Sequence, residues 1–302
     1  MGGLLSRYAW SSRFETWASP LSDTADEKCQ NAESVIRSAI TSDSSLSNLE
    51  IRVYAQGSYK ANTNVRADSD VDICVENKAT FFYEMPPNMT PHNAGFVSGQ
   101  GMQFSDFKNM VGTALYNRLG YLNVERGNKA FKIKENTYRI QADVVPTFTY
   151  RKYYWQGSAP IFVAGVCFFT DSGEKIVNWP EHTLANGRGK NQKTGWRYKK
   201  VVRVLKGLRY EMESNGSLSA KKVSSFQIAC LAYNVSNGFY GKDELYDDVK
   251  GVVGQIWYHM TDTTHCSAWT EVDEIKPLIT TDQKRLECRD FFWDLMQYAS
   301  LS

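Results

Sequence analysis

The sequence predicts an α+β protein with two lobes, in which a mixed or antiparallel sheet with helices is followed by a helical lobe. Segments with strand-like apolar spacing occur in the first part of the chain. After Pro180, apolar residues recur mostly at helical spacings of three and four. The length of 302 residues, 42% of them hydrophobic, suits one large two-lobed domain or two ordinary ones. We place the core at residues 1–190 and the helical lobe at 191–302, and leave open whether the N-terminal helix spans both.

The elements of the first lobe follow from apolar spacing and turn residues. Ala25, Cys29 and Ala32 begin a helical pattern that continues to Ile40. Prolines and glycines interrupt residues 77–103, which predicts an irregular surface insertion. The other predicted elements are strands at 51–56 and 71–75, a helix at 107–119, an antiparallel pair at 130–133 and 138–145, and a hairpin of 161–169 with 175–177.

The second lobe begins with a polar segment, residues 183–195, that is rich in glycine, asparagine and lysine. This composition predicts a linker or a mobile loop. Four helices are expected after it, at 196–214, 223–236, 243–260 and 282–300. The chain is therefore predicted to pass from a mixed α/β half to a helical half.

Composition limits the classes of partner. The formal net charge of +2 leaves no large positive excess, so we expect no long nucleic acid as a partner. The longest apolar run, residues 160–169, is about half of a membrane span, so we expect no membrane segment. The six cysteines form no CxxC pair and follow no secretory signal, which predicts reduced thiols in a cytoplasmic protein.

Residues 56–76 carry the strongest chemical signal. Gly57 and Ser58 end one predicted strand and should open a short helix, whose unpaired N–H groups attract phosphate. The glycine also lets a ligand approach the backbone closely. Asp70 and Asp72 then stand two positions apart in a predicted strand, so their carboxylates face the same side. Two such carboxylates, about 6–7 Å apart along a strand, can hold hard cations.

A third carboxylate, Asp143, lies in another strand-like segment, residues 138–146. The apolar residues at 140, 142 and 144 would face one side, which leaves Asp143 on the opposite side. An acid in such a strand is poor core material unless it has a partner or a metal ion. Three carboxylates of this kind suit the transfer of a nucleotidyl group with the help of divalent ions.

Each motif has an ordinary structural explanation when it is taken alone. A lone Asp-x-Asp is usually solvated, and a Gly-Ser pair at a strand end is usually only a turn. The order strand, Gly-Ser, helix, strand, with a third acid in a later strand, is much more specific than either piece. The combined pattern therefore predicts a catalytic site at Asp70, Asp72 and Asp143.

This arrangement resembles the polymerase-β-like nucleotidyltransferases, and more closely the bacterial CD-NTases, which are relatives of cyclic GMP-AMP synthase and DncV. The likeness covers most of the chain, from Gly57 through the helices after residue 196. Gly57 and Ser58 match the Gly-Ser motif of that family, and Asp70, Asp72 and Asp143 match its three acids. The resemblance implies a two-lobed fold, in which an α/β core and a helical lobe close over a nucleotide cleft.

The same resemblance implies further nucleotide-binding residues. A phosphate-contacting lysine falls on Lys206, and a serine and an aromatic residue near the donor nucleotide fall on Ser225 and Phe226. A lysine neutralises triphosphate charge, and an aromatic ring can stack on a base. The alternatives are a solvated helix charge for Lys206 and core packing for Phe226. The remaining candidates, all near the Gly-Ser motif, are Gln56, Lys60 and Arg66.

The resemblance implies an enzyme that joins nucleoside triphosphates into a cyclic di- or trinucleotide, releases pyrophosphate and acts in anti-phage (CBASS) signalling. Two Mg²⁺ ions, or Mn²⁺ in their place, would bind to Asp70, Asp72 and Asp143. The substrates would be ATP and possibly GTP, UTP or CTP. CBASS accessory proteins would be the protein partners. The protein would be a monomer. The alternatives are a template-free RNA nucleotidyltransferase of the poly(A)- or CCA-adding type, a small antitoxin or antibiotic-modifying nucleotidyltransferase, and a catalytically silent nucleotide-binding scaffold.

Overall fold

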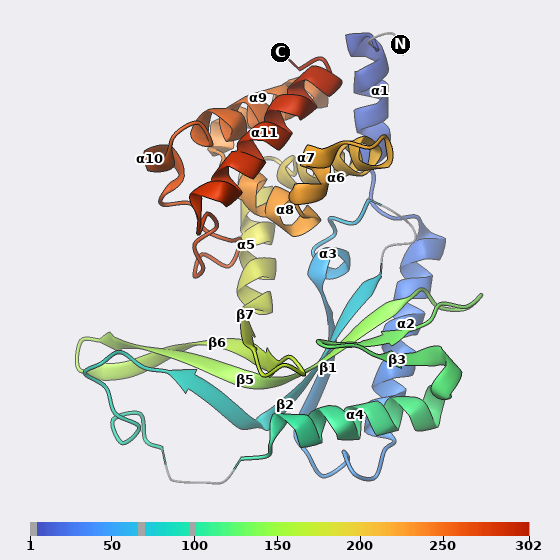
Figure 1. Ribbon diagram of the computed structural model, residues 1–302, viewed down its shortest axis with the longest axis vertical. Coiled ribbons are helices and arrows are strands. Elements are labelled where there is room, and N and C mark those ends of the chain that lie inside the picture. The colour runs from blue at the N-terminus through green and yellow to red at the C-terminus, as the bar shows by residue number, and fades with distance from the viewer. Residues whose placement is uncertain (1–4, 66–69, 97–100, 302) are drawn as a thin grey trace. The chain divides into compact units, whose positions relative to one another are not determined.

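The computed structural model describes residues 5–65, 70–96 and 101–301, which belong to two compact units (Figure 1). One unit contains the sheet and comprises residues 22–60 and 68–181. The other unit is helical and comprises residues 1–21, 61–67 and 182–302. The predicted α+β class with a helical C-terminal part is confirmed. The N-terminal helix, whose lobe the sequence left open, belongs to the helical unit, and so does the segment after residue 60, which the sequence boundary at residue 190 included in the core.

Seven strands form one mixed sheet within the described residues, in the order β1-β2-β5-β4-β3, and β6 joins β5 to β7. β2 and β5 run parallel to each other, and all other pairs are antiparallel. One edge of β5 therefore pairs with β2, while its other edge pairs first with β4 and then with β6. The strands are β1 (Ile51–Gln56), β2 (Val71–Glu84), β3 (Val124–Arg126), β4 (Phe131–Ile133), β5 (Ala142–Gln156), β6 (Ala159–Phe169) and β7 (Lys175–Asn178).

Two helices, α2 (Asp23–Thr41) and α4 (Phe104–Leu119), cover one face of this sheet (Figure 1). Both have buried apolar residues at helical spacing, as the sequence predicts for α2 and for most of α4. α4 approaches the sheet closely at Gly112, where an added Cβ would lie 2.7 Å from the ring of Phe131. Because this face is filled by apolar side chains, polar residues of the same strands must use the other face.

The predicted irregular insertion at residues 77–103 is partly regular. β2 continues to Glu84, and a register shift between Asn77 and Phe81 lets it pair with β5 on both sides of this irregularity. The ring of Phe82 packs on those of Phe148 and Phe169, with centroids 5.9 and 5.2 Å apart. The prediction was wrong here because the bulge interrupts the alternation that marks a strand, although aromatic residues favour strands.

Residues 183–195, predicted as a linker or loop, are mostly helical in α5 (Pro180–Lys193). Pro180 occupies the first helical position, where its missing N–H costs nothing. The helix has no apolar stripe, and its buried residues are Gly187 and Asn191. The side chain of Asn191 accepts a hydrogen bond of 3.0 Å from the backbone N–H of Lys199. A helix held by polar contacts gives no apolar periodicity, which explains the wrong prediction.

The helical unit is built around α6 (Tyr198–Ser214), which is buried along most of its length. α1 (Arg7–Ala18) contributes Trp10 and Phe14 to the same core, and the ring of Phe14 stacks on Tyr246 with centroids 5.8 Å apart. This packing explains why the N-terminal helix belongs to this unit. The other helices are α7 (Leu218–Lys222), α8 (Ser225–Asn234), α9 (Leu245–His259), α10 (Thr263–Cys266) and α11 (Asp282–Tyr298), and single 3₁₀ turns occur at Tyr121–Asn123 and Asn237–Phe239.

All six cysteines are buried and none is bonded to another. Burial raises the pKa of the Cys167 thiol to about 12, so this thiol stays protonated and unreactive at neutral pH. In the part of the chain that the structure describes, no helix has both the length and the apolar character needed to cross a membrane.

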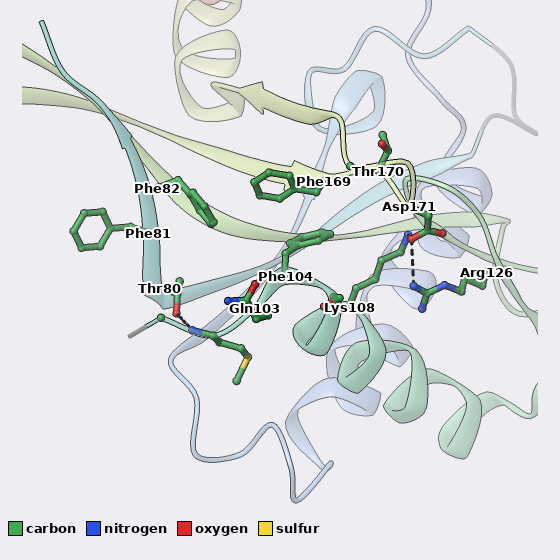
Figure 2. A pocket seen from close by; sticks show the side chains of 14 residues that line it. Thr80, Phe81, Phe82, Gln103, Phe104, Lys108, Arg126, Phe169, Thr170 and Asp171 are labelled. Carbon is green, nitrogen blue, oxygen red and sulfur yellow. Dashed lines mark hydrogen bonds and ion pairs between the residues drawn. The ribbon is translucent and has the colours of Figure 1, made fainter. Parts of the chain in front are cut away.

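Lys108 of α4 fixes the turns beside the sheet and is only 1% exposed. Its Nζ donates to the carbonyl oxygens of Gly127 and Asn128, at 3.1 and 2.9 Å, and to the carboxylate of Asp171 at 2.8 Å. Arg126 forms a second ion pair with Asp171 at 3.2 Å (Figure 2). Lys108 therefore connects the helix to the β3–β4 and β6–β7 turns.

These charged groups line the polar end of a cavity of about 570 Å³, whose apolar walls include Phe82, Phe104 and Phe169 (Figure 2). Lys108 and Arg126 both pair with Asp171, and the three N–H donors of Lys108 are already taken by Gly127, Asn128 and Asp171. We therefore assign the cluster a structural role.

We predict that Lys108→Met lowers the free energy of unfolding by about 2–4 kcal/mol, because three acceptors lose a buried charged donor. Thermal and urea unfolding followed by circular dichroism would measure the loss. Lys129→Met is the matched control, because Lys129 is exposed beside the same turn and should tolerate the change. Equal stability of the two variants would contradict the structural role of Lys108.

Candidate active site

A row of polar side chains crosses the sheet at the start of β2 and β5. Directly paired residues point to the same face of a sheet, and Asp72 is paired with Asp143 on the neighbouring parallel strand. The residues just before these two acids, Val71 and Ala142, are fully buried on the opposite face. The complete row, from β1 through β2 and β5 to β4, is Gln56, Asp72, Asp143 and Lys132.

The Gly-Ser motif forms the single helical turn α3 (Gly57–Lys60) at the end of β1. Gly57 has a φ of +67°, and an added Cβ would lie 2.0 Å from the Oδ2 atom of Asp72. Only glycine satisfies both the backbone and the adjacent carboxylate at this position. Ser58 is partly buried and Lys60 is exposed in the same turn. The structure thus brings the Gly-Ser motif against the acid of the next strand.

Asp70 lies immediately before β2, whereas the sequence placed it inside the strand. The pairing of β2 with β5 begins at Val71, whose N–H donates to the carbonyl of Gln141 at 3.0 Å. Asp70 is exposed, while Asp72 and Asp143 are partly buried. The two strand acids are therefore positioned by sheet pairing, whereas Asp70 lies just before the paired residues.

The three acids interact electrostatically. Burial, and then the charges of Asp143 and Asp70, raise the pKa of Asp72 to about 6. Burial and the charge of Asp70 also raise the pKa of Asp143, and Lys132 opposes that shift. Like charges crowded into a poorly solvated place disfavour ionisation unless a cation joins them.

The carboxylate oxygens of these acids are suitable ligands for a divalent cation. The Oδ1 atom of Asp143 is buried and accepts no hydrogen bond from the described residues, so it lacks the partner that a buried carboxylate oxygen normally has. Carboxylate oxygens are the donors that Mg²⁺ prefers. As the side chains stand, no three acidic, histidine or cysteine side chains of the described residues form a group ready to hold a metal ion. A bound cation would therefore need Asp70 to join the two paired acids.

The other predicted residues lie in the helical unit, except Arg66, which lies outside the described residues. Lys206 is 4% exposed, and its Nζ donates to the carbonyl and hydroxyl oxygens of Thr63 at 3.0 and 3.2 Å. The alternative of a solvated helix charge is therefore wrong. The phosphate contact of Lys206 stays a prediction.

Phe226 is 48% exposed, so the alternative of core packing is wrong and its ring is accessible to a base. Ser225 is the first residue of α8, but the residue that caps the helix is Ser224, which forms a capping box with Gln227. The hydroxyl of Ser225 donates to that of Tyr210 at 2.9 Å. The role of Ser225 near the donor nucleotide stays a prediction.

Sequence reasoning missed Lys132, which is exposed on β4 directly opposite Asp143. The alternation Phe131-Lys132-Ile133 does show that the lysine faces away from the buried side. Its pairing with Asp143 depends on strand register, which the sequence does not show.

Comparison with known proteins gives the class of this chain. Residues 185–300 match the family described as the cGAS/DncV-like nucleotidyltransferase C-terminal helical domain. The chain is 38% identical to the cyclic dipyrimidine nucleotide synthase CdnE of Legionella pneumophila, over 96% of this chain and 97% of that protein. It is 32% identical to the cyclic GMP-AMP synthase CdnE03 of Staphylococcus schleiferi, over 96% of each chain. The chain belongs to the bacterial CD-NTase family of nucleotidyltransferases.

Solved structures agree with this assignment. The CdnE c-UMP-AMP synthase of Rhodothermus marinus, solved with Apcpp and Upnpp, has a TM-score of 0.80 and 28% identity, covering 95% of this chain and 96% of that chain. The CdnE cyclic dinucleotide synthase of Elizabethkingia meningoseptica, solved with GTP and Apcpp, has a TM-score of 0.78 and 29% identity, covering 95% and 98%. The protein is therefore an enzyme of the nucleotidyltransferase class with the two-part fold of its family.

We predict that Gly57→Ala lowers nucleotidyl transfer at least ~100-fold, because the new Cβ and the carboxylate of Asp72 cannot both keep their places. Pyrophosphate release measures the rate, and thermal unfolding should show a loss of about 1–2 kcal/mol from the left-handed backbone. Gly254→Ala in α9 is the control, because no atom lies within 4 Å of its added Cβ. Wild-type rates in Gly57→Ala would contradict the described contact.

We predict that Asp72→Asn stabilises the metal-free protein at pH 8 by on the order of 2 kcal/mol. The folded-state pKa of about 6 lies above the ordinary value of 3.8, so the charged carboxylate destabilises the fold above pH 6. The destabilisation caused by the charged carboxylate disappears as the pH falls toward 4. The stability gained by Asp72→Asn should disappear over the same pH range. Thermal unfolding across this range tests the effect, with exposed Asp243→Asn as the control. A gain that is independent of pH would refute the assigned cause.

Proposed function

We propose that this enzyme joins nucleoside triphosphates into a cyclic di- or trinucleotide and releases pyrophosphate. The observation that carries the proposal is the direct pairing of Asp72 with Asp143, beside the turn that begins at Gly57. Paired carboxylates next to a tight Gly-Ser turn are the groups that nucleotidyl transfer from a triphosphate needs. The names of the relatives support cyclic products.

In this proposal the chain's own residues bind and orient two nucleotides. The Gly57-Ser58 turn and Lys60 receive the phosphates of the donor, and the exposed ring of Phe226 stacks on a base. Asp70, Asp72 and Asp143 would hold two Mg²⁺ ions, for which Mn²⁺ could substitute. The chemistry that such ions would supply there is a lower pKa for the attacking ribose hydroxyl and compensation of negative charge on the leaving pyrophosphate. Asp143, with its unpartnered oxygen, lies on the side of the row away from the Gly-Ser turn, which suits the acceptor hydroxyl.

The choice of bases differs among the relatives. Two of them, 38% and 35% identical to this chain, are named cyclic dipyrimidine nucleotide synthases, and another, 32% identical, is named a cyclic dipurine nucleotide synthase. We therefore propose a cyclic dinucleotide as the main product, with UTP and CTP as the first substrates to test beside ATP and GTP. The family resemblance supports a role in anti-phage (CBASS) signalling, with CBASS accessory proteins as partners of a cytoplasmic monomer.

We predict that the wild-type protein with Mg²⁺ and the four triphosphates gives small cyclic products, and that Asp143→Asn lowers their yield at least ~1000-fold while the fold persists. Chromatography with linkage-specific nuclease digestion identifies the products, and circular dichroism checks the fold. Extension of added RNA without cyclic products would favour the template-free RNA enzyme. Nucleotide binding without pyrophosphate release would favour the silent scaffold.

A further inference from the structure

Arg139 is a buried cation without a partner. It belongs to the unit with the sheet and is only 8% exposed. Among the described residues its guanidinium forms no ion pair and donates no hydrogen bond, and its Nε atom is buried. Burial lowers the pKa of Arg139, but a guanidinium keeps its charge in proteins. A buried charge is costly unless an anion or several acceptors surround it, so this place suits an anionic ligand.

The backbone around Arg139 is held by hydrogen bonds. Arg139 lies in the turn that joins β4 to β5. Its N–H donates to Oδ1 of Asn136 at 2.8 Å, and its carbonyl accepts from the N–H of Asn136 at 2.9 Å. From α2, Nδ2 of Asn31 donates to the carbonyl of Tyr138 at 3.0 Å. These contacts position the turn, and none of them uses the guanidinium.

Arg139 lies on the same side of the sheet as the paired acids. Ile140 and Ala142, at 4% and 0% exposure, are buried on the face that the helices cover. Side chains alternate along an extended chain, so Arg139 and Gln141 point to the side of Asp143. Four residues of extended chain, about 13 Å, separate Arg139 from Asp143. A nucleotide whose ribose lies at Asp143 can therefore extend its phosphates toward this guanidinium.

The β4–β5 turn and its flanks are locally positive, although the whole chain is close to neutral. Residues 129–141 contain four basic residues and one acidic residue, Glu135. Lys132 on β4 and Lys134 just after it are exposed, and neither forms an ion pair with a described residue. Glu125 of β3 is the cross-strand neighbour of Lys132 and offsets part of this charge. The excess of positive charge favours a ligand with several negative charges.

We propose that Arg139 and the positive surface of the β4–β5 turn bind the triphosphate of the acceptor nucleotide. The proposed function places the donor phosphates at the Gly57-Ser58 turn beside β1, and the acceptor hydroxyl at Asp143, nearer the other end of the polar row. The acceptor also carries a triphosphate, which needs cations away from the donor. A guanidinium binds two phosphate oxygens with its planar fork. The anion site stands on the described residues alone, whereas its assignment to the acceptor rests on the proposed function.

Nuclear magnetic resonance with inorganic tripolyphosphate tests the anion site without catalysis. In metal-free and nucleotide-free protein, the backbone amide signals of residues 136–141 and the Nε–Hε signal of Arg139 should shift saturably as tripolyphosphate is added. Arg139→Met should weaken this binding at least ~10-fold, because charge-assisted hydrogen bonds are lost. Arg118→Met is the matched control, since Arg118 is exposed on α4 and forms no ion pair with a described residue. Unmoved signals in the wild-type protein, or equal affinities of the two variants, would overturn the proposal.

Thermal unfolding separates a ligand site from a structural arginine. A buried charge without a partner does not stabilise the fold, so Arg139→Met should leave the melting temperature unchanged or raise it in buffer without multivalent anions. Tripolyphosphate should stabilise the wild-type protein more than this variant. A large loss of stability in Arg139→Met would show that the guanidinium is bonded within the fold, and would refute the ligand site. Arg139→Lys keeps the charge but loses the fork, and should bind tripolyphosphate with intermediate affinity.

Acceptor kinetics test the assignment to the acceptor nucleotide. A nucleoside without phosphates can serve only as an acceptor, so its use can be compared with that of its triphosphate at a saturating concentration of labelled donor. In the wild-type protein kcat/KM should favour the triphosphate acceptor, and Arg139→Met should lower that preference at least ~10-fold. Equal losses with both acceptors would contradict the assignment. If the protein transferred no nucleotide, the proposed function would fail, yet the tripolyphosphate titration would still decide whether Arg139 is an anion site.

Discussion

Mutual repulsion of carboxylates on one sheet face is the constraint on which the rest of this enzyme depends. Parallel pairing of β2 and β5 places Asp72 and Asp143 directly opposite each other, and Asp70 lies close enough to raise the pKa of both. Isolated acids in such a place are unfavourable, and the fold does not neutralise them with an ion pair among the described residues. At neutral pH the repulsion between these carboxylates lowers the stability of the folded protein, and a bound cation can remove that repulsion.

The surrounding fold explains how that cost is tolerated. α2 and α4 fill the opposite face with apolar side chains, and the buried core there supplies the stability that the acid face lacks. The turn at Gly57 leaves just enough space for the carboxylate of Asp72. The Tyr59 hydroxyl of the same turn donates to Asp26 of α2 at 3.0 Å, which ties the turn to the helix layer.

Much of this could be predicted from the sequence, because apolar periodicity and the spacing of Gly57, Asp70 and Asp72 are local signals. The α+β class, the order of most elements and the candidate acids came from such signals. Three features could not be predicted in this way, because they depend on register and on contacts distant in sequence. They are the extension of β2 past a bulge, the polar helix α5 and the pairing of Lys132 with Asp143. The same limit applies to Lys206, whose partner Thr63 lies 143 residues away.

The central claim is that Asp72 and Asp143 share a divalent cation. Anomalous diffraction from crystals grown with Mn²⁺ and a non-hydrolysable nucleoside triphosphate tests it most directly. The account predicts a strong anomalous peak within about 2.5 Å of a carboxylate oxygen of each residue. A peak elsewhere in the protein, with both carboxylates free of metal, would contradict it.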